Sequence, residues 1–224
     1  MEAVYQLKAI WNGTTTADVL RLLQESASQH QNALDMGREN MRRLGLLWMI
    51  TRQKLIFERR PVPGEPVTVT TWLSEVRHGM LLRHYEMTGI DGAVICRAAA
   101  VWTLVDAEKR TLAQLPLSVP LVQKEGQLSR FPLLRPMETI REFSFTVPQA
   151  YLDENGHMNN ARYFDAVTPI LPKGGVLRTA QVDYHLEARE EETLAIGYVV
   201  QESDFFIQAK SDRGLCFRMK LTYE

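Results

Sequence analysis

Two stretches of this 224-residue chain predict the same order of elements: a strand, a helix and then four strands. In the first half, residues 4–11 predict a strand and residues 17–34 predict a helix. Five apolar residues of that helix follow the 3.6-residue period and define one apolar face: Val19, Leu20, Leu23, Ala27 and Leu34. Runs rich in Val, Ile, Thr and aromatic residues then predict strands at 47–58, 67–75, 81–88 and 93–106.

The second half repeats this order in a shorter form. Residues 139–146 predict a strand, a polar loop follows, and a helix is expected from about 160 to 168. Four more strands are predicted at 176–186, 193–202, 204–209 and 215–223. Between the halves, residues 115–135 hold three prolines and no clear period, which indicates a connector. We therefore predict two domains, 1–118 and 137–224, joined by a linker at 119–136.

This order predicts an α+β fold. A single antiparallel sheet with one apolar face can wrap around one central helix. Two such units can pair their sheets, which would close an otherwise exposed edge strand.

The run from Tyr151 to Val167 concentrates the polar chemistry of the chain. Asp153, Asn155 and His157 alternate, so in an extended segment their side chains leave from the same side. Asn159 or Asn160 is a good N-cap for the helix that follows. The plain alternative is a turn and a capped helix without catalysis, because Asp, Asn and Gly are common turn residues.

The motif D-x-N-x-H-x-N-N-x-x-Y, from Asp153 to Tyr163, resembles the active-site motif of the plant and bacterial acyl-acyl-carrier-protein (acyl-ACP) thioesterases. A Y-x-x-E pattern from Tyr184 to Glu187 matches the acidic residue of that family. Four stretches of the first half also resemble the family: residues 22–30, 51–52, 59–73 and 97–116. The resemblance implies two tandem hot-dog domains, hydrolysis of acyl-ACP, acyl carrier protein as partner, and the first domain as scaffold and acyl pocket.

The resemblance also nominates the site residues: Asp153, Asn155, His157 and Glu187 as catalytic, and Asn159, Asn160 and Tyr163 as substrate-binding. We expect Glu187 to act as general base on water, while Asn155 and the helix N-terminus polarise the carbonyl. Asp153 and His157 would orient Asn155, or His157 would protonate the leaving sulfur. The alternative for Glu187 is a surface acid within the acidic run that ends at Glu192.

A covalent cysteine mechanism is disfavoured, because Ala188 follows Glu187 where some plant members have cysteine. Cys96 and Cys216 read as buried thiols in a reducing cytosol, which predicts a cytoplasmic protein. No signal peptide or membrane span is apparent, and a net charge of −1 argues against nucleic-acid or membrane partners. The five histidines lack a zinc spacing, no nucleotide-binding or G-x-S-x-G motif occurs, and no cofactor or metal is expected.

Several alternatives remain open at this level. The same chemistry on acyl-coenzyme A, a catalytically silent acyl-binding protein, and a hydratase or dehydratase are compatible with such a fold. Local arginine clusters indicate either solvated surface or a landing site for an acidic partner, and a homodimer is possible. In the first half, Gln24, Glu25 and His30 of the long helix could face the second-half site, although we expect solvent or interdomain contacts for them.

Overall fold

The computed structural model describes residues 2–116 and 118–224, which form two compact units. Unit 1 comprises the residues up to 14 together with 19–131, and unit 2 comprises 15–18 together with 132–224. The division between the units therefore falls between Phe131 and Pro132, inside the stretch that the sequence marks as a connector.

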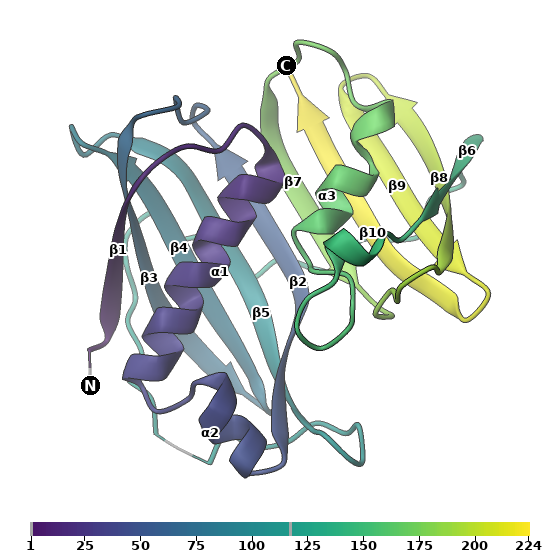
Figure 1. Cartoon of the computed structure of the whole chain (residues 1–224). Helices are drawn as coiled ribbons and strands as arrows, with labels where there is room; N and C mark the ends of the chain where they lie inside the picture. Colours follow the sequence, from purple (N-terminus) through teal and green to yellow (C-terminus); the bar gives the residue numbers. More distant parts are fainter. Residues whose placement is uncertain (1, 117) are drawn as a thin grey trace. The chain divides into compact units, whose positions relative to one another are not determined.

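Unit 1 is a curved antiparallel sheet with one long helix across its face (Figure 1). The strand order is β1-β3-β4-β5-β2, and neighbouring strands are antiparallel. Its elements are β1 (Val4–Ile10), α1 (Thr16–Ala33), α2 (Arg38–Arg43), β2 (Leu46–Phe57), β3 (Pro66–Arg77), β4 (Met80–Gly89) and β5 (Val94–Asp106).

The apolar face of α1 forms the centre of unit 1. All five residues that the helical period selects, Val19, Leu20, Leu23, Ala27 and Leu34, have no exposed surface. This confirms the predicted central helix, because burial of such a face supplies most of the stability of a helix in a protein.

The second face of the unit 1 sheet is covered as well. Phe131 of the connector packs with Leu82, Ala99 and Val101. The indole of Trp72 donates to Gln127 at 3.0 Å. The connector is thus attached to unit 1 as far as Phe131, which explains why β4 is buried on both faces.

Unit 2 repeats the arrangement with a much shorter helix. Its strand order is β7-β10-β9-β8-β6, again antiparallel, and α3 lies across one face (Figure 1). The elements are β6 (Arg141–Thr146), the 3₁₀ turn η1 (Gln149–Tyr151), α3 (Arg162–Ala166), the 3₁₀ turn η2 (Thr168–Ile170), β7 (Leu177–Tyr184), β8 (Thr193–Gln201), β9 (Asp204–Ser211) and β10 (Gly214–Tyr223).

The element order in both halves agrees with the sequence prediction, with two differences. The long helix is followed by a second short helix, α2, which the sequence did not indicate and which has Gly37 at its N-cap. The second-half helix is five residues long, because Pro169 has no N–H to continue its hydrogen bonds, and a 3₁₀ turn follows.

Candidate active site

The polar loop is a tight hairpin organised around the Asp153 carboxylate. Asp153 Oδ1 accepts the backbone N–H of Asn155 at 2.8 Å and of His157 at 3.3 Å. The main chain closes through a bond from the N–H of Asp153 to the carbonyl of His157 at 2.7 Å. Gly156 adopts a φ of 75°, a conformation that favours glycine at this turn. Asp153 therefore fixes the backbone on which Asn155 and His157 stand.

The loop brings His157 to Glu187, thirty positions later in the chain. The Nε2 atom of His157 lies 3.6 Å from Oε2 of Glu187, and each side chain is 27% exposed. An isolated bridge pairs His157 with Arg189, and the N–H of Met158 donates to the carbonyl of Ala188 at 2.8 Å. These backbone contacts hold the imidazole against the carboxylate in a partly exposed position.

Hydrogen bonds of Asn159, Asn160 and Tyr163 hold together the segments that carry the site. Asn159 Oδ1 accepts the N–H of Ala161 at 2.9 Å, so it caps the turn before α3 and not a helical N–H. The carbonyl of Asn160 accepts the hydroxyl of Tyr184 at 2.9 Å. The hydroxyl of Tyr163 accepts the N–H of Ala188 at 3.1 Å.

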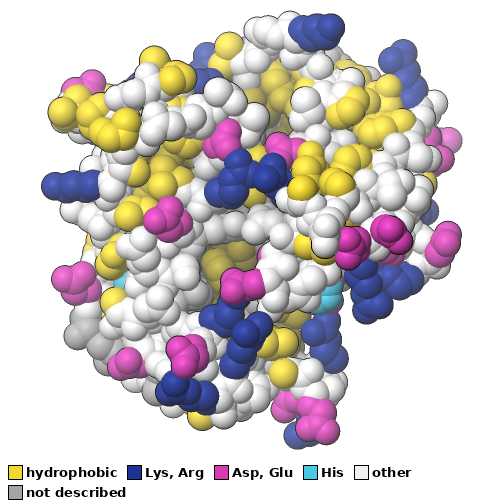
Figure 2. Space-filling view, viewed as in Figure 1, with side chains coloured by type: hydrophobic (Ala, Val, Ile, Leu, Met, Phe, Trp, Pro, Cys, Tyr) yellow, Lys and Arg dark blue, Asp and Glu magenta, His cyan; other side chains and the backbone are white. Residues whose placement is uncertain are grey.

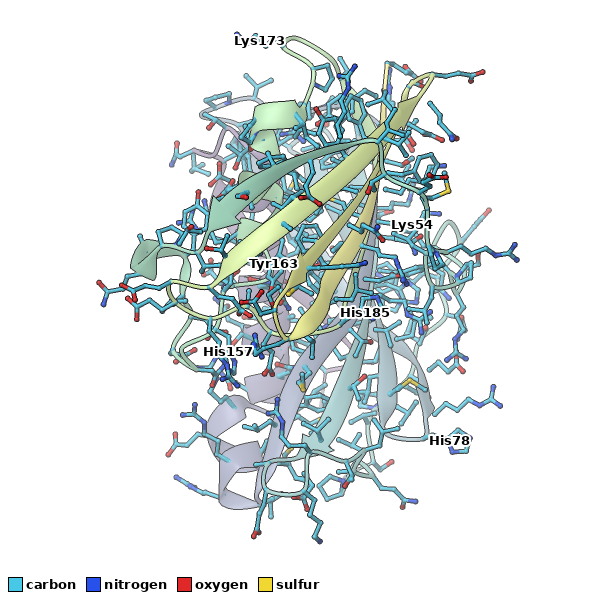
Figure 3. The ribbon with its side chains drawn as sticks, turned by 90° about the vertical axis from the view of Figure 1, so that its right-hand side faces the viewer. Lys54, His78, His157, Tyr163, Lys173 and His185 are labelled. Atoms are coloured by element: carbon cyan, nitrogen blue, oxygen red, sulfur yellow. The ribbon has the colours of Figure 1, made fainter. Side chains whose placement is uncertain are left out.

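Tyr163 lies inside unit 2, on α3, whereas His157 lies in the loop before it (Figure 3). Its ring makes edge contacts with Tyr184 and Phe217, each with centroids 5.2 Å apart. Burial raises the pKa of its phenol. Tyr163 thus stays neutral and ties α3 to the residue after Glu187; its predicted contact with substrate stays a prediction.

Arg213 is a site residue that the sequence reasoning missed. Its guanidinium donates to Glu192 at 2.7 and 2.8 Å and to the backbone carbonyl of Glu187. The hydrogen bond from Arg213 lowers the pKa of Glu192 to about 2. The basic turn before β10 thereby anchors the acidic run, and only the tertiary structure brings the two together.

Cys216 lies nearer the site than its sequence position indicates. The backbone carbonyl of Cys216 in β10 accepts the N–H of His185 at 2.8 Å. The thiol is buried and contacts the hydroxyl of Ser211 at 3.6 Å. Burial raises the pKa of the Cys216 thiol, which keeps it protonated and unsuited to nucleophilic attack.

Unit 1 places different chemistry at the matching positions. Glu58, which like Glu187 follows a strand and precedes a turn, contacts Arg97 at 3.4 Å with 56% of its side chain exposed. We had expected solvent or interdomain contacts for His30. Instead it is fully buried in unit 1 and hydrogen-bonded to Arg83. The acid-amide-imidazole loop therefore belongs to unit 2 alone.

Other site types find little support in the residues described. No cluster of three or more His, Cys, Asp or Glu side chains could hold a metal ion among residues 2–116 and 118–224. Within the same ranges, none of the helices combines the length and the apolar character that a membrane crossing requires.

The arginine clusters are largely engaged in ion pairs. Arg59 pairs with Glu65, Arg130 lies 3.4 Å from Glu75, and Arg43 lies 2.6 Å from Glu39. Figure 2 shows basic side chains interspersed with acidic ones over the visible face. The arginines thus give little support to a continuous basic landing site.

Comparison with solved structures identifies the fold. An acyl-ACP thioesterase from Bacteroides thetaiotaomicron superposes with a TM-score of 0.91 over 99% of this chain and 98% of that chain, at 18% identity. The 12:0-ACP thioesterase from Umbellularia californica superposes with a TM-score of 0.82 over 100% and 98%, at 17% identity. This is the hot-dog fold of the acyl-ACP thioesterases. The predicted α+β fold class is confirmed.

Sequence comparison agrees with the structural likeness. Residues 9–119 match the model of the acyl-ACP thioesterase N-terminal domain. A chloroplastic acyl-[acyl-carrier-protein] hydrolase, FATB3 of Cuphea viscosissima, is 24% identical over 200 residues, which cover 79% of this chain and 48% of the relative. The resemblance found in the motifs is confirmed. The chain spans about half the length of the curated relatives that it matches, and the loop and Glu187 lie outside the matched N-terminal domain.

Proposed function

We propose that this protein hydrolyses fatty acyl thioesters of acyl carrier protein to a free fatty acid and the carrier thiol. The observation that carries the proposal is the 3.6 Å approach of His157 to Glu187 beside the loop that Asp153 orders. The acyl-ACP thioesterase fold and the named relatives support it.

In the proposed first step, the Glu187 carboxylate takes a proton from water as the water oxygen attacks the thioester carbonyl. The carbonyl oxygen becomes an oxyanion that hydrogen-bond donors must stabilise. We assign this role to the side-chain amide of Asn155, because α3 has only five residues and its dipole is correspondingly small. Asp153 fixes the position of Asn155 through the backbone.

In the second step, the tetrahedral intermediate collapses, its carbon–sulfur bond breaks, and a thiolate leaves. The proton held by Glu187 passes through Nε2 of the adjacent imidazole of His157 to the sulfur. The products are the fatty acid and the free thiol, and Glu187 returns to its ionised form. Water attack needs no protein nucleophile, which fits the protonated, buried state of Cys216.

Unit 1 is proposed as the scaffold and the pocket for the acyl chain, with the domain boundaries predicted from the sequence. Acyl carrier protein is the proposed carrier because the named relatives act on its thioesters, while the ion pairing of the arginines removes the weak additional support that the basic clusters gave. The cytoplasmic location and a homodimer stay predictions.

The test is release of free thiol from matched panels of acyl-ACP and acyl-coenzyme A thioesters of graded chain length. Higher kcat/KM on acyl-ACP at equal chain length is the expected result. A preference for the coenzyme A series would replace the carrier but keep the chemistry. No thiol release from any thioester would contradict hydrolysis and favour a silent acyl-binding protein, whereas hydration of enoyl thioesters would favour a hydratase.

A further inference from the structure

The interior of unit 1 contains an arginine that no described carboxylate neutralises. Arg83 of β4 has no exposed surface. Its Nη1 donates to Oγ1 of Thr71 at 3.1 Å and to Nδ1 of His30 at 3.0 Å. Its Nε and Nη2 are buried without a hydrogen-bond acceptor in the described protein. A buried charge of this kind is costly, because desolvation is not offset by an opposite charge.

His30 does not provide the missing negative charge. Because Arg83 donates to Nδ1, the ring proton is on Nε2, which donates to the backbone carbonyl of Glu2 at 3.0 Å. Burial, and then the charge of Arg83, lower the pKa of His30. The imidazole is therefore neutral, and the guanidinium is the charged member of this cluster.

The residue that lies beside Arg83 in the sheet has a small side chain. Ala100 of β5 pairs with Arg83 on one side and with Gln53 of β2 on the other, so the three side chains share one face. Neighbouring strands lie about 4.8 Å apart, so the backbones at Gln53 and Arg83 lie roughly 10 Å apart. Ala100, the sheet residue between them, contributes only a methyl group. Gln53 is fully buried, and neither its Oε1 nor its Nε2 has a protein partner.

The helix above contributes one more unpartnered polar group. Ser26 of α1 precedes His30 by four residues, so both side chains leave from the same face of the helix. Ser26 has no exposed surface, and its Oγ has no hydrogen-bond partner in the described protein. Three buried side chains, Ser26, Gln53 and Arg83, thus present unused donors or acceptors between one helix and one sheet face. Buried polar groups are normally satisfied, which indicates that these groups serve a ligand.

The free donors specify the chemistry of that ligand. Nε and Nη2 of Arg83 form one edge of the planar guanidinium, the edge that holds a carboxylate through two parallel hydrogen bonds. A single positive charge balances a single carboxylate better than a dianionic phosphate. Leu55 and Ala98, which follow Gln53 and flank Ala100 along the same face, are apolar and buried. The surroundings therefore suit an aliphatic chain.

We propose that unit 1 has a binding site for the carboxylate of an aliphatic acid, formed by Arg83 with Gln53 and Ser26 between α1 and the sheet. The site is separate from the loop of unit 2 and goes beyond the proposed hydrolysis. Only the naming of a free fatty acid as the natural ligand rests on that function, since fatty acids are the product of the proposed reaction.

The experiment measures binding of decanoate and of its methyl ester to the whole chain by calorimetry, with melting temperature as a second readout. Wild type should bind decanoate about tenfold or more tightly than the ester, because the ester cannot pair with the guanidinium. Arg83→Met should lose this preference while melting at the same or a higher temperature, since it removes an unneutralised buried charge. Arg97→Met, on the outer ion pair with Glu86, is the matched control and should keep the preference.

Three results would overturn the proposal: equal binding of acid and ester by wild type, no binding of decanoate, or an unchanged preference in Arg83→Met. If Arg83→Met does not fold, Gln53→Leu decides, and an unchanged affinity for decanoate in that variant overturns the site. The assay involves no turnover. If wild type binds decanoate but releases no thiol from any thioester, only the proposed hydrolysis is contradicted. If wild type releases thiol but does not bind decanoate, only this site is contradicted.

Discussion

Glu187 differs from the acidic residues that follow it in the groups that surround its side chain and its backbone. Its carboxylate lies 3.6 Å from the imidazole of His157, while its backbone carbonyl is held by Arg213. Glu190 of the same acidic run is exposed, and Glu192 is committed to Arg213. The description of a surface acid thus fits Glu190, and Glu187 is the carboxylate that we propose as the general base.

Replacement of Glu187 tests this assignment. Glu187→Gln keeps the size of the side chain and removes the base, so kcat for thioester hydrolysis should fall by about a hundredfold to ten-thousandfold. The melting temperature should stay near that of wild type, because the carboxylate is partly exposed and its contact with His157 is a long one of 3.6 Å. Glu190→Gln is the control and should leave kcat unchanged. A near-normal kcat in Glu187→Gln would refute the role as base.

The hairpin from η1 to α3 is ordered by hydrogen bonds within the segment and by its contacts with the strand end after β7. Asp153 satisfies two backbone N–H groups, and Asn159 satisfies a third. The N–H of Asn159 itself donates to the carbonyl of Tyr151 at 2.9 Å. A loop whose polar backbone groups are satisfied in this way holds Asn155 and His157 in one geometry without a long helix behind them.

Two substitutions of Asp153 separate its geometric role from its charge. Asp153→Asn keeps an oxygen that can accept the N–H groups of Asn155 and His157, whereas Asp153→Ala removes it. We expect kcat to fall clearly more in Asp153→Ala, with a loss of unfolding free energy of about 1 kcal/mol, the usual effect of deleting a capping oxygen. Steady-state kinetics and urea unfolding of the pair provide the measurement. Equal losses in both variants would instead assign the effect to the negative charge.

Each unit contains an arginine–glutamate ion pair in the loops that connect its strands. Arg59 lowers the pKa of Glu65 to about 2 in unit 1, and Arg213 does the same for Glu192 in unit 2. Glu65 also accepts the N–H of Val62, so it closes the proline-rich turn before β3. Both carboxylates bind protons less readily in the folded than in the unfolded chain.

This difference predicts how stability depends on pH in acid. Because the folded pKa is depressed, the contribution of each pair is complete above the ordinary glutamate pKa of about 4.5 and is lost as the pH falls toward 2. The urea midpoint should therefore drop between pH 5 and pH 3. Glu192→Gln should lower the midpoint at pH 7 and show a smaller drop in acid than wild type. Glu190→Gln should behave as wild type at both pH values, and an identical acid profile in Glu192→Gln would contradict the linkage.

Much of the fold was predictable from local pattern. The apolar residues that the helical period selects are all buried, and the strand-rich runs all form strands. Two features are not predicted by the spacing of apolar residues. The helix α2 is short and follows Gly37, and α3 ends before Pro169. The polar loop and Glu187 both lie in unit 2.

The sequence by itself determined the two helix-and-sheet units and the segment that carries the polar loop, because burial periodicity and turn residues act over a few positions. Only the tertiary structure decided that His157 meets Glu187, that Arg213 holds the acidic run, and that His30 lies in the core against Arg83. Each of these contacts joins residues at least 21 positions apart, and such pairings depend on strand register and packing, which local sequence does not encode.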